Sequence, residues 1–504
     1  MCYWRLRGRC SSSCALPTGR IHIAGIAIPA ITEKPVKSLG KVFDSSLSDT
    51  TSIQLTCAEL GGGGWGGLPG KFKAWVYKHG VLPRILWHRL AYAVPISTVE
   101  TLERKVSHHL RRWLGLPKSL SSIALCGRNN KLQLPIKSLE EEFKVTRARE
   151  VMQYRDSGDP KWRAEEAVQE AEGRLHHRSL VGVVTRGRAG VGSFPTPQLN
   201  TRGKERRRLV QEEVRAAVEE VRLCKAVGMR QQGAWTGWEN AVERKVTWTE
   251  IWKAEPHHIK FLIEAVYDVL PSPSNLHTWG IAETPACPLC SKRGTLEHIL
   301  SCCTMALGEG RYRWRHDQVL KPIAEAISTG LVLAKQFHPS KKTMAFVRAG
   351  EQAAPVKRSP AGILTFAGDW QLLVDLERQL KFPSHIVVTT LRPDIVLVSE
   401  STKQAVLLEL TVPWEDRMEE ASERKLSKYA GLVSDCQQAG WRARCLPEEV
   451  GCRGFAARYL VRALSSLGIE RVRKRRAIRN TTEAAERASR WLWLKREEPW
   501  TSGS

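Results

Sequence analysis

Two short apolar runs joined by a polar link organise the last quarter of the chain. Residues 394–398 and residues 405–412 have the composition of buried strands, and residues 399–404 have that of a turn. A hairpin symmetric about this link places Asp394 directly opposite Glu409. Facing side chains in a hairpin have Cβ atoms about 4.5–5.5 Å apart, so these carboxylates can share one cation. We expect a metal, a lysine or a proton between them, because two bare carboxylates repel.

The segments after this hairpin complete an α/β pattern. Residues 415–432 predict a helix on which Lys425 and Lys428, three positions apart, share a face. A strand at residues 441–445, an amphipathic helix at residues 454–467 and a basic, tryptophan-containing final helix from residue 471 follow. This element order predicts an α/β sandwich that presents the hairpin at an open edge.

The first half of the chain has a different character. Residues 21–29 and 36–43 alternate like short strands, the glycine run at residues 61–67 indicates a boundary, and residues 71–270 have a helical pattern. Residues 97–100 predict a capping box that opens a helix with Val99, Leu102, Val106, Leu110 and Trp113 on one face. Its other face is basic, either solvated or in contact with a nucleic-acid backbone. Further helices are expected at residues 139–154, 161–174 and 204–227, and a surface loop at residues 182–201.

A compact set of metal-ligand residues lies between these two halves. Cys287 and Cys290 form a Cys-x-x-Cys knuckle, and His298 and Cys303 follow at short spacing. Three thiolates and one imidazole suit tetrahedral zinc. Because four protein ligands leave no coordination position open for water or substrate, we expect a structural role for this zinc. Cys302 competes with Cys303 for the fourth place, and ordinary buried cysteines are the alternative.

The amino-acid composition indicates what kind of partner the chain binds. Among 504 residues, 78 Lys and Arg outnumber 52 Asp and Glu, which gives a formal charge of +26, as in chains that follow a phosphate backbone. The alternative is a basic surface without a dedicated partner. Most of the 18 tryptophans should be core residues, although aromatic faces also stack on unpaired bases.

The cysteines and the apolar runs indicate a location. The 13 cysteines are odd in number and follow no secretory signal, and no apolar run could span a membrane, so we expect an intracellular protein with reduced thiols. The basic residues 471–476 resemble a nuclear-localisation patch. Residues 310–317 interleave aromatic and basic side chains. This pattern is typical of nucleic-acid contact, here by Arg311, Arg313, Arg315 and His316, and equally of an ordinary basic helix start.

Taken together, these motifs resemble the carboxy-terminal part of LINE-type (non-LTR) retrotransposon polyproteins that carry a restriction-enzyme-like endonuclease. The matching residues are the Cys287–Cys290–His298–Cys303 knuckle, Arg315-His-Asp317, Arg392-Pro-Asp394, Glu409 to Glu415, and Lys425 with Lys428. The resemblance is specific over residues 270–470. Polymerases of that family need an adjacent Asp-Asp pair, which this chain does not contain, so reverse transcriptase activity is not expected.

The resemblance implies a mixed fold in five parts: a reverse transcriptase palm remnant at residues 1–60, a helical thumb and linker at 61–270, a CCHC zinc knuckle at 271–335, an α/β domain of the PD-(D/E)XK restriction-endonuclease type at 345–470, and a basic tail at 471–504. It implies DNA and element RNA as partners, no membrane association, and a nuclear location.

The implied chemistry is metal-dependent nicking of DNA. Asp394 and Glu409 would hold Mg²⁺, and Arg392 would contact the nucleic acid. In the parent restriction-enzyme fold a catalytic lysine lies two residues after the second acid, but here that position is Thr411. Lys425 or Lys428 would then supply the positive charge from the following helix. The alternatives are a nucleic-acid-binding remnant without catalysis, or a fragment with no cellular role.

Overall fold

The structure is a computed structural model. It describes residues 67–90, 95–156, 203–336, 362–376 and 379–500, together with residues 22–23, 25–27, 36–38, 41–43, 58 and 158. Near the amino terminus it contains two small antiparallel pairs, β1 (His22–Ile23) with β2 (Ile26–Ala27) and β3 (Val36–Ser38) with β4 (Lys41–Phe43), where short strands are expected. The predicted helix at residues 161–174 and the predicted loop at residues 182–201 lie outside the described residues.

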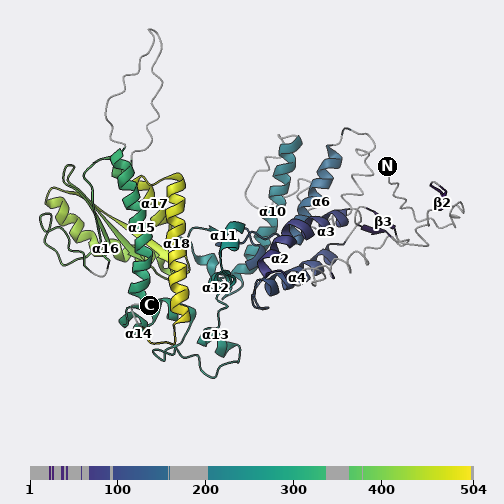
Figure 1. The fold of residues 1–504 in the computed structure, drawn as a ribbon, viewed down its shortest axis with the longest axis horizontal. Helices are drawn as coiled ribbons and strands as arrows, with labels where there is room; N and C mark the ends of the chain where they lie inside the picture. Colours follow the sequence, from purple (N-terminus) through teal and green to yellow (C-terminus); the bar gives the residue numbers. More distant parts are fainter. Residues whose placement is uncertain are drawn as a thin grey trace, which may run out of the picture.

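A helical unit follows, on the right of Figure 1. It consists of α2 (Gly70–Val76), a π-helical turn η1 (Tyr77–Val81), α3 (Leu82–Leu90), α4 (Ile96–Trp113), α6 (Leu139–Arg155) and α10 (Gly203–Val227). The periodic apolar residues of α4 are buried as predicted, apart from Trp113, which is half-buried. They pack with Tyr77 and Ile85 into one core.

The predicted capping box at residues 97–100 is wrong. Helix α4 begins two residues earlier, at Ile96 in place of Thr98, and its N-cap is Pro95, which has no side chain able to accept a hydrogen bond. The extended backbone of Pro95 starts the helix, so Ser97 already lies in its first turn. There, the Ser97 carbonyl oxygen accepts a hydrogen bond from the Thr101 hydroxyl (2.9 Å).

Short elements connect the helical unit to the rest of the chain. They are α5 (Ile123–Cys126), β5 (Leu132–Gln133), η3 (Ala234–Gly237), β6 (Arg244–Lys245), α11 (Trp248–Lys253), α12 (Pro256–Val266) and α13 (Pro273–Thr278). Helix α11 has a complete capping box, in which the Thr247 side chain and Glu250 bond reciprocally. Strand β6 pairs in parallel with β5, which fastens this connector to the helical unit.

The carboxy-terminal unit, on the left of Figure 1, is built on a five-stranded sheet in the order β11-β10-β9-β8-β7. Its strands are β7 (Gln371–Val374), β8 (Ile395–Ser399), β9 (Gln404–Thr411), β10 (Arg442–Gly451) and β11 (Phe455–Ala456). Strands β8 and β9 form the predicted hairpin, with Ser399 paired to Gln404 and Ile395 to Leu408. The predicted register is therefore confirmed. Strand β10 joins β9 in parallel, so the sheet is mixed.

Helices cover both faces of this sheet. On one face, α16 (Met418–Gln438) buries Tyr429, Leu432 and Cys436 against alternate residues of β8 and β9. On the other, α15 (Arg311–Gln336), α17 (Arg458–Leu467) and α18 (Arg471–Leu494) cover the intervening residues. The strands are buried on both sides, which explains their continuous apolar sequence. The fold is thus mixed helix and sheet, as expected. The prediction that the hairpin lies at an open edge is wrong, because β7 flanks β8 and β10 flanks β9.

Two secondary-structure predictions need correction in this unit. The strand predicted at residues 441–445 extends to Gly451, because β10 follows β9 along its whole length. The helix predicted from residue 454 begins at Arg458, since Phe455 and Ala456 pair with β10 as strand β11. Among the described residues, no helix combines the length and the apolar character needed to cross a bilayer.

The two units meet around the buried guanidinium of Arg453, which follows β10. It lies 3.9 Å from the ring centre of Trp238 and 3.5 Å from that of Trp414, and it forms an ion pair of 2.5 Å with Glu415. Trp238 belongs to the connector, whereas Trp414 and Glu415 follow the hairpin strand β9. Gly451 is required beside them, because a Cβ at that position would lie 2.4 Å from a carboxylate oxygen of Glu415.

We expect Glu415→Ala to lower the free energy of unfolding by about 3–5 kcal/mol, because it leaves the Arg453 guanidinium charged and unpaired in the core. Urea unfolding of the full chain, followed by tryptophan fluorescence, measures the change. The exposed Glu423→Ala on α16 is the matched control and should shift the value by less than about 0.5 kcal/mol. Equal effects of the two substitutions would contradict the structural role of this ion pair.

Candidate zinc centre and carboxylate centre

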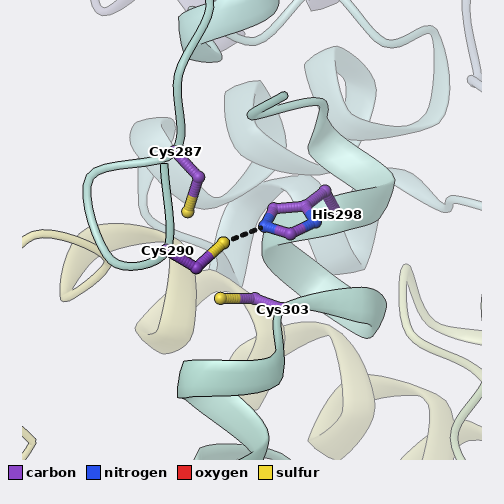
Figure 2. Close-up of side chains that lie close together, drawn as sticks. All are labelled: Cys287, Cys290, His298 and Cys303. Atoms are coloured by element: carbon purple, nitrogen blue, oxygen red, sulfur yellow. Dashed lines mark hydrogen bonds between the residues drawn. The ribbon is translucent and has the colours of Figure 1, made fainter. Parts of the chain in front are cut away.

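Four ligand-type side chains converge at the junction between the connector and α15. Cys287, Cys290, His298 and Cys303 place one ligand atom each within 4.8 Å of one another, and three of the four are sulfur (Figure 2). The Cys290 Sγ and His298 Nε2 atoms lie 3.0 Å apart. This donor set and its closeness fit tetrahedral zinc without an open coordination position. Cys302 lies outside the set, because its side chain is exposed and faces Glu297.

The local backbone explains why these residues converge. An isolated bridge pairs Ala286 with Arg293, and the Cys287 N–H donates to the Lys292 carbonyl oxygen (2.6 Å), so the first two cysteines share a tight loop. The π-helical turn η4 (His298–Cys302) then carries the histidine, and Cys303 directly follows it, before α14 (Thr304–Gly308). The wider turn brings His298 and Cys303 to the same side of the chain (Figure 2).

The pKa values of these ligands act in different directions on metal binding. Burial, with a contribution from Lys292, lowers the pKa of His298, which keeps the imidazole neutral at physiological pH. Burial raises the pKa of the Cys287 thiol to about 11. Burial also acts to raise the pKa of Cys290, but hydrogen bonds from the Lys292 backbone and the neighbouring thiols lower it overall. Zinc must displace thiol protons here, so its affinity rises with pH.

The second centre lies at the open end of the β8–β9 hairpin. The Asp394 N–H donates to Glu409 Oε1 (3.1 Å), and the Leu410 N–H donates to Asp394 Oδ2 (2.9 Å). Both acids are buried, Asp394 at 4% and Glu409 at 0% exposure. The predicted juxtaposition of the two carboxylates is therefore present. The Tyr429 hydroxyl donates to the Arg392 carbonyl oxygen (2.8 Å) and holds the start of the strand against α16.

A lysine supplies the positive charge that these carboxylates require. The Lys425 ammonium, on α16, donates to Glu409 Oε2 at 2.6 Å and lies 3.8 Å from Asp394 Oδ2. Lys428, one turn further along, is exposed and donates to the Tyr429 hydroxyl (2.9 Å) instead. Of the two lysines singled out from the sequence, the structure brings only Lys425 to the carboxylates.

Helix α15 adds a second cation. His316 Nε2 lies 3.2 Å from Asp394 Oδ2, and its Nδ1 lies 3.0 Å from Asp317 Oδ1. Arg313 extends toward the same place, with its Nη1 atom 3.9 Å from Asp394 Oδ1. Sequence reasoning assigned both residues to nucleic-acid contact. It gave no signal that they meet Asp394, because they lie far from the hairpin in the sequence.

The pKa values follow this arrangement. Burial opposes ionisation of Asp394, but His316 and Lys425 outweigh it and lower the pKa of this carboxyl group. Burial and the neighbouring Asp394 raise the pKa of Glu409. Burial acts to lower the pKa of His316, but its bonds to Asp317 and Asp394 raise it to about 9. The centre therefore contains one ionised acid, one acid that resists ionisation, and an imidazolium.

The proposed nucleic-acid contacts need partial correction. Arg311 and Arg315 are each 2% exposed. The Arg311 guanidinium donates to the Lys495 and Glu498 carbonyl oxygens, and that of Arg315 donates to the carbonyl oxygens of Leu300 (2.7 Å) and Val412 (3.1 Å). Because these guanidinium groups fasten α15 to its neighbours, they are not available to a phosphate backbone. Arg392 is exposed and remains a candidate contact.

A cleft of about 460 Å³ connects the zinc-bearing segment to the carboxylate centre. Ser301 and Cys302 line one side, the segment after β9 lines another, and α16 contributes two basic side chains, Arg424 and Lys425. The basic residues that line it are Arg313, Arg315, His316, Arg417, Arg424 and Lys425, and its acidic residues are Asp394 and Glu420. Arg417 also pairs with Glu297 of the zinc-bearing segment (2.9 Å), which ties the two sides together.

Two further acids lie next to this centre on β10. Glu448 and Glu449 pair in register with Leu410 and Thr411 of β9, and both are fully buried. Their carboxyl oxygens have no hydrogen-bond partner within the described part of the chain. Burial raises the pKa of Glu448 to about 8, and Glu449 and Asp394 act in the same direction. The sequence signals neither acid, because no pattern in Leu-Pro-Glu-Glu-Val shows that β10 lies inside the sheet.

The zinc ligands can be tested with neighbouring cysteines. We expect Cys303→Ser to lose bound zinc after dialysis, whereas Cys302→Ser should retain about one zinc per chain, because only the Cys303 sulfur lies in the cluster. Metal content is measured by mass spectrometry of the dialysed protein. Loss of zinc in Cys302→Ser alone would contradict the assignment.

Glu448 should make stability depend on pH. Its folded-state pKa of about 8 lies above the unfolded value of about 4.3, so the folded chain holds the extra proton between these values. Stability is then lost as the pH rises, by about 1.4 kcal/mol per pH unit. Relative to wild type, Glu448→Gln should become progressively more stable from about pH 6 to about pH 8 in urea unfolding. The exposed Glu420→Gln should show no such trend.

Comparison with known proteins adds one family. A model described as zinc-binding in reverse transcriptase matches residues 231–308, from the end of α10 through the zinc cluster. No curated protein gives a significant match to the chain. The matched segment contains the connector from η3 to α13, including Trp238 and α11, and ends just beyond Cys303. Residues 231–308 thus correspond to a zinc-binding domain of reverse-transcriptase-type proteins, and the four-ligand cluster lies within them.

Proposed function

We propose that this protein is a metal-dependent DNA endonuclease of a non-LTR retrotransposon of the LINE type, with a PD-(D/E)XK-like centre. The observation that carries the proposal is the pair of buried, facing carboxylates, Asp394 and Glu409, with the Lys425 ammonium 2.6 Å from Glu409. Asp394 and Lys425 line the basic cleft next to this pair. The zinc-binding match to reverse-transcriptase-type proteins supports a retroelement context.

The donor set suits a hard divalent cation such as Mg²⁺, because carboxylate oxygens are its preferred protein ligands. Asp394 and Glu409 would hold the ion, which when bound polarises the scissile phosphate and lowers the pKa of an attacking water. Asp394 Oδ1 is the least engaged of the four oxygens, with its nearest described cation, Arg313, at 3.9 Å. It is the natural first contact for an incoming ion.

The surrounding residues have distinct tasks in this proposal. Lys425 orients the water and stabilises the charge that develops on the phosphate, the task of the lysine whose usual position is Thr411 here. Arg424 and Arg417 line the same cleft and provide positive charge for the flanking phosphates. The zinc cluster performs no chemistry, but it holds the wall formed by Ser301 and Cys302. The function requires access to DNA, so a nuclear location and element RNA as a second partner belong to the proposal.

The second candidate is a nucleic-acid-binding protein without catalysis. Thr411 favours it, because a residue without charge occupies the usual lysine position, and the Lys425–Glu409 ion pair already satisfies the carboxylates without a metal. The charge of +26 and the zinc-binding domain would suffice for such binding. Tight, salt-sensitive binding without cleavage in Mg²⁺ or Mn²⁺ would select this candidate.

A nicking assay on supercoiled plasmid DNA tests the proposal. With Mg²⁺ or Mn²⁺, the full chain should convert supercoiled DNA to open circles, and Asp394→Asn or Glu409→Gln should abolish this. Lys425→Ala should reduce the nicking rate by about 10²–10³-fold, as expected for loss of one charge-stabilising group.

Lys428→Ala is the matched control, because it removes the same charge from the same helix but not from the carboxylates. It should leave nicking within about threefold of wild type, an effect smaller than 1 kcal/mol. Nicking that persists in both acid variants would sink the assignment of this centre.

A further inference from the structure

A cluster of aromatic rings lies on the helical unit, formed by two segments far apart in the sequence. Phe72, Trp75 and His79 come from α2 and η1, and Trp248 and Trp252 come from α11. The ring centres of Phe72 and Trp252 are 4.5 Å apart, those of Trp75 and His79 are 4.8 Å apart, and those of Trp248 and Trp252 are 5.8 Å apart and stacked. His79 also approaches Trp248 at 6.3 Å. These five residues are called the aromatic platform below.

The aromatic platform faces outward. Phe72 is 41% exposed and Trp75 is 40% exposed, although the same helix buries Ala74 and Tyr77 completely. Adjoining aromatic rings that stay partly in water lose the favourable free energy of burial. Such patches therefore mark binding surfaces more often than single exposed apolar residues do.

The α2–α3 side of the platform and the adjacent cleft are basic, whereas α11 itself contains one acid, Glu250, in its capping box. Residues 70–90 contain five Lys and Arg and no acidic residue. The Lys78 ammonium lies 5.7 Å from the ring centre of Trp248. Next to the platform is a cleft of about 330 Å³ whose lining includes Lys71, Arg112, His257 and Lys260. None of the described residues that line this cleft is acidic.

Lys71 holds the two segments of the platform together. Its ammonium donates to the carbonyl oxygens of Ile251, Trp252 and Ala254 at 2.9–3.4 Å, which are acceptors at the carboxyl end of α11. The lysine therefore fixes α11 against α2, and it also lines the cleft next to the platform. The rings are thus pre-arranged rather than independent side chains on a loop.

We propose that the aromatic platform binds the unpaired bases of a single-stranded nucleic acid, with its phosphates in the adjacent basic cleft. A ring face accepts any base, and each stacked base contributes about 1–3 kcal/mol. A paired duplex keeps its base faces covered and cannot use the rings. An acidic partner protein would suit the charge but not the five rings, whereas a single strand satisfies both.

This inference goes beyond the proposed nuclease, because the platform shares no residue with the carboxylate centre or its cleft. The test is equilibrium binding by fluorescence anisotropy, without Mg²⁺ and in the Asp394→Asn chain, so that cleavage cannot intervene. The probes are labelled oligothymidylate and oligouridylate of about 16 nucleotides, at the upper end of single-strand site sizes, and a duplex of equal length.

Phe72→Ala and Trp75→Ala should each weaken single-strand binding by about fivefold or more, the loss of at least about 1 kcal/mol of stacking, with duplex binding nearly unchanged. The matched controls are Phe366→Ala and Trp279→Ala, which remove similarly exposed rings outside the platform. They should change neither single-strand binding nor duplex binding. All four positions are at least 40% exposed, so the variants should fold.

Three results would overturn the inference: no loss of binding in the platform variants, equal losses of binding for single strand and duplex, or equal losses in the controls.

A further measurement tests whether another segment of this chain covers the platform in the free protein. Acrylamide should quench Trp75 in the free protein, seen as the difference between wild type and Trp75→Ala, and bound oligonucleotide should protect it. A Trp75 that is already inaccessible without oligonucleotide would show that the platform is an internal interface.

Discussion

A buried arginine lies at the junction between the carboxy-terminal unit and the rest of the chain, among several contacts that join them. The Arg453 guanidinium lies between the rings of Trp238 and Trp414 and pairs with Glu415. A planar, weakly hydrated guanidinium suits this position, because it can stack on both rings and bond a carboxylate in its own plane. Trp238 belongs to the segment that matches the zinc-binding family, whereas Trp414 and Glu415 directly follow the hairpin. Arg453 thus links the connector to the segment that follows the hairpin.

Helix α15 makes the second connection, and it contacts both centres within two turns. The Tyr312 hydroxyl bonds the backbone of His298, Ile299 and Cys303, next to the zinc ligands. The Arg315 guanidinium joins the Leu300 carbonyl oxygen to that of Val412, and His316 reaches Asp394. A structural zinc ion therefore has a consequence beyond its own loop. It fixes the turn on which α15 rests, and α15 in turn delivers a cation to the carboxylates.

The carboxylate centre shows how a buried site balances its charges. Two acids in a nearly dry environment cannot both ionise without compensation. Here Lys425 and His316 compensate Asp394, while the pKa of Glu409 remains raised by burial and by its neighbour. Glu448 and Glu449 add buried acids on the next strand without partners among the described residues. These buried acids thus lie beside a cleft whose lining has more basic than acidic residues.

The sequence by itself determined the hairpin, its register and three of the four zinc ligands, because each depends on local spacing, whereas the structure selected Cys303 over Cys302 as the fourth. Alternation and a short link place Asp394 opposite Glu409, and knuckle spacing brings Cys287 near Cys290. Only the tertiary structure decided the contacts between distant segments. It selected Lys425 over Lys428, because one turn of α16 separates a lysine that faces the sheet from one that faces water. It buried Arg311 and Arg315, brought His316 to Asp394, and joined α2 to α11 in the aromatic platform. Those outcomes depend on how elements pack across long sequence separations, which local patterns do not encode.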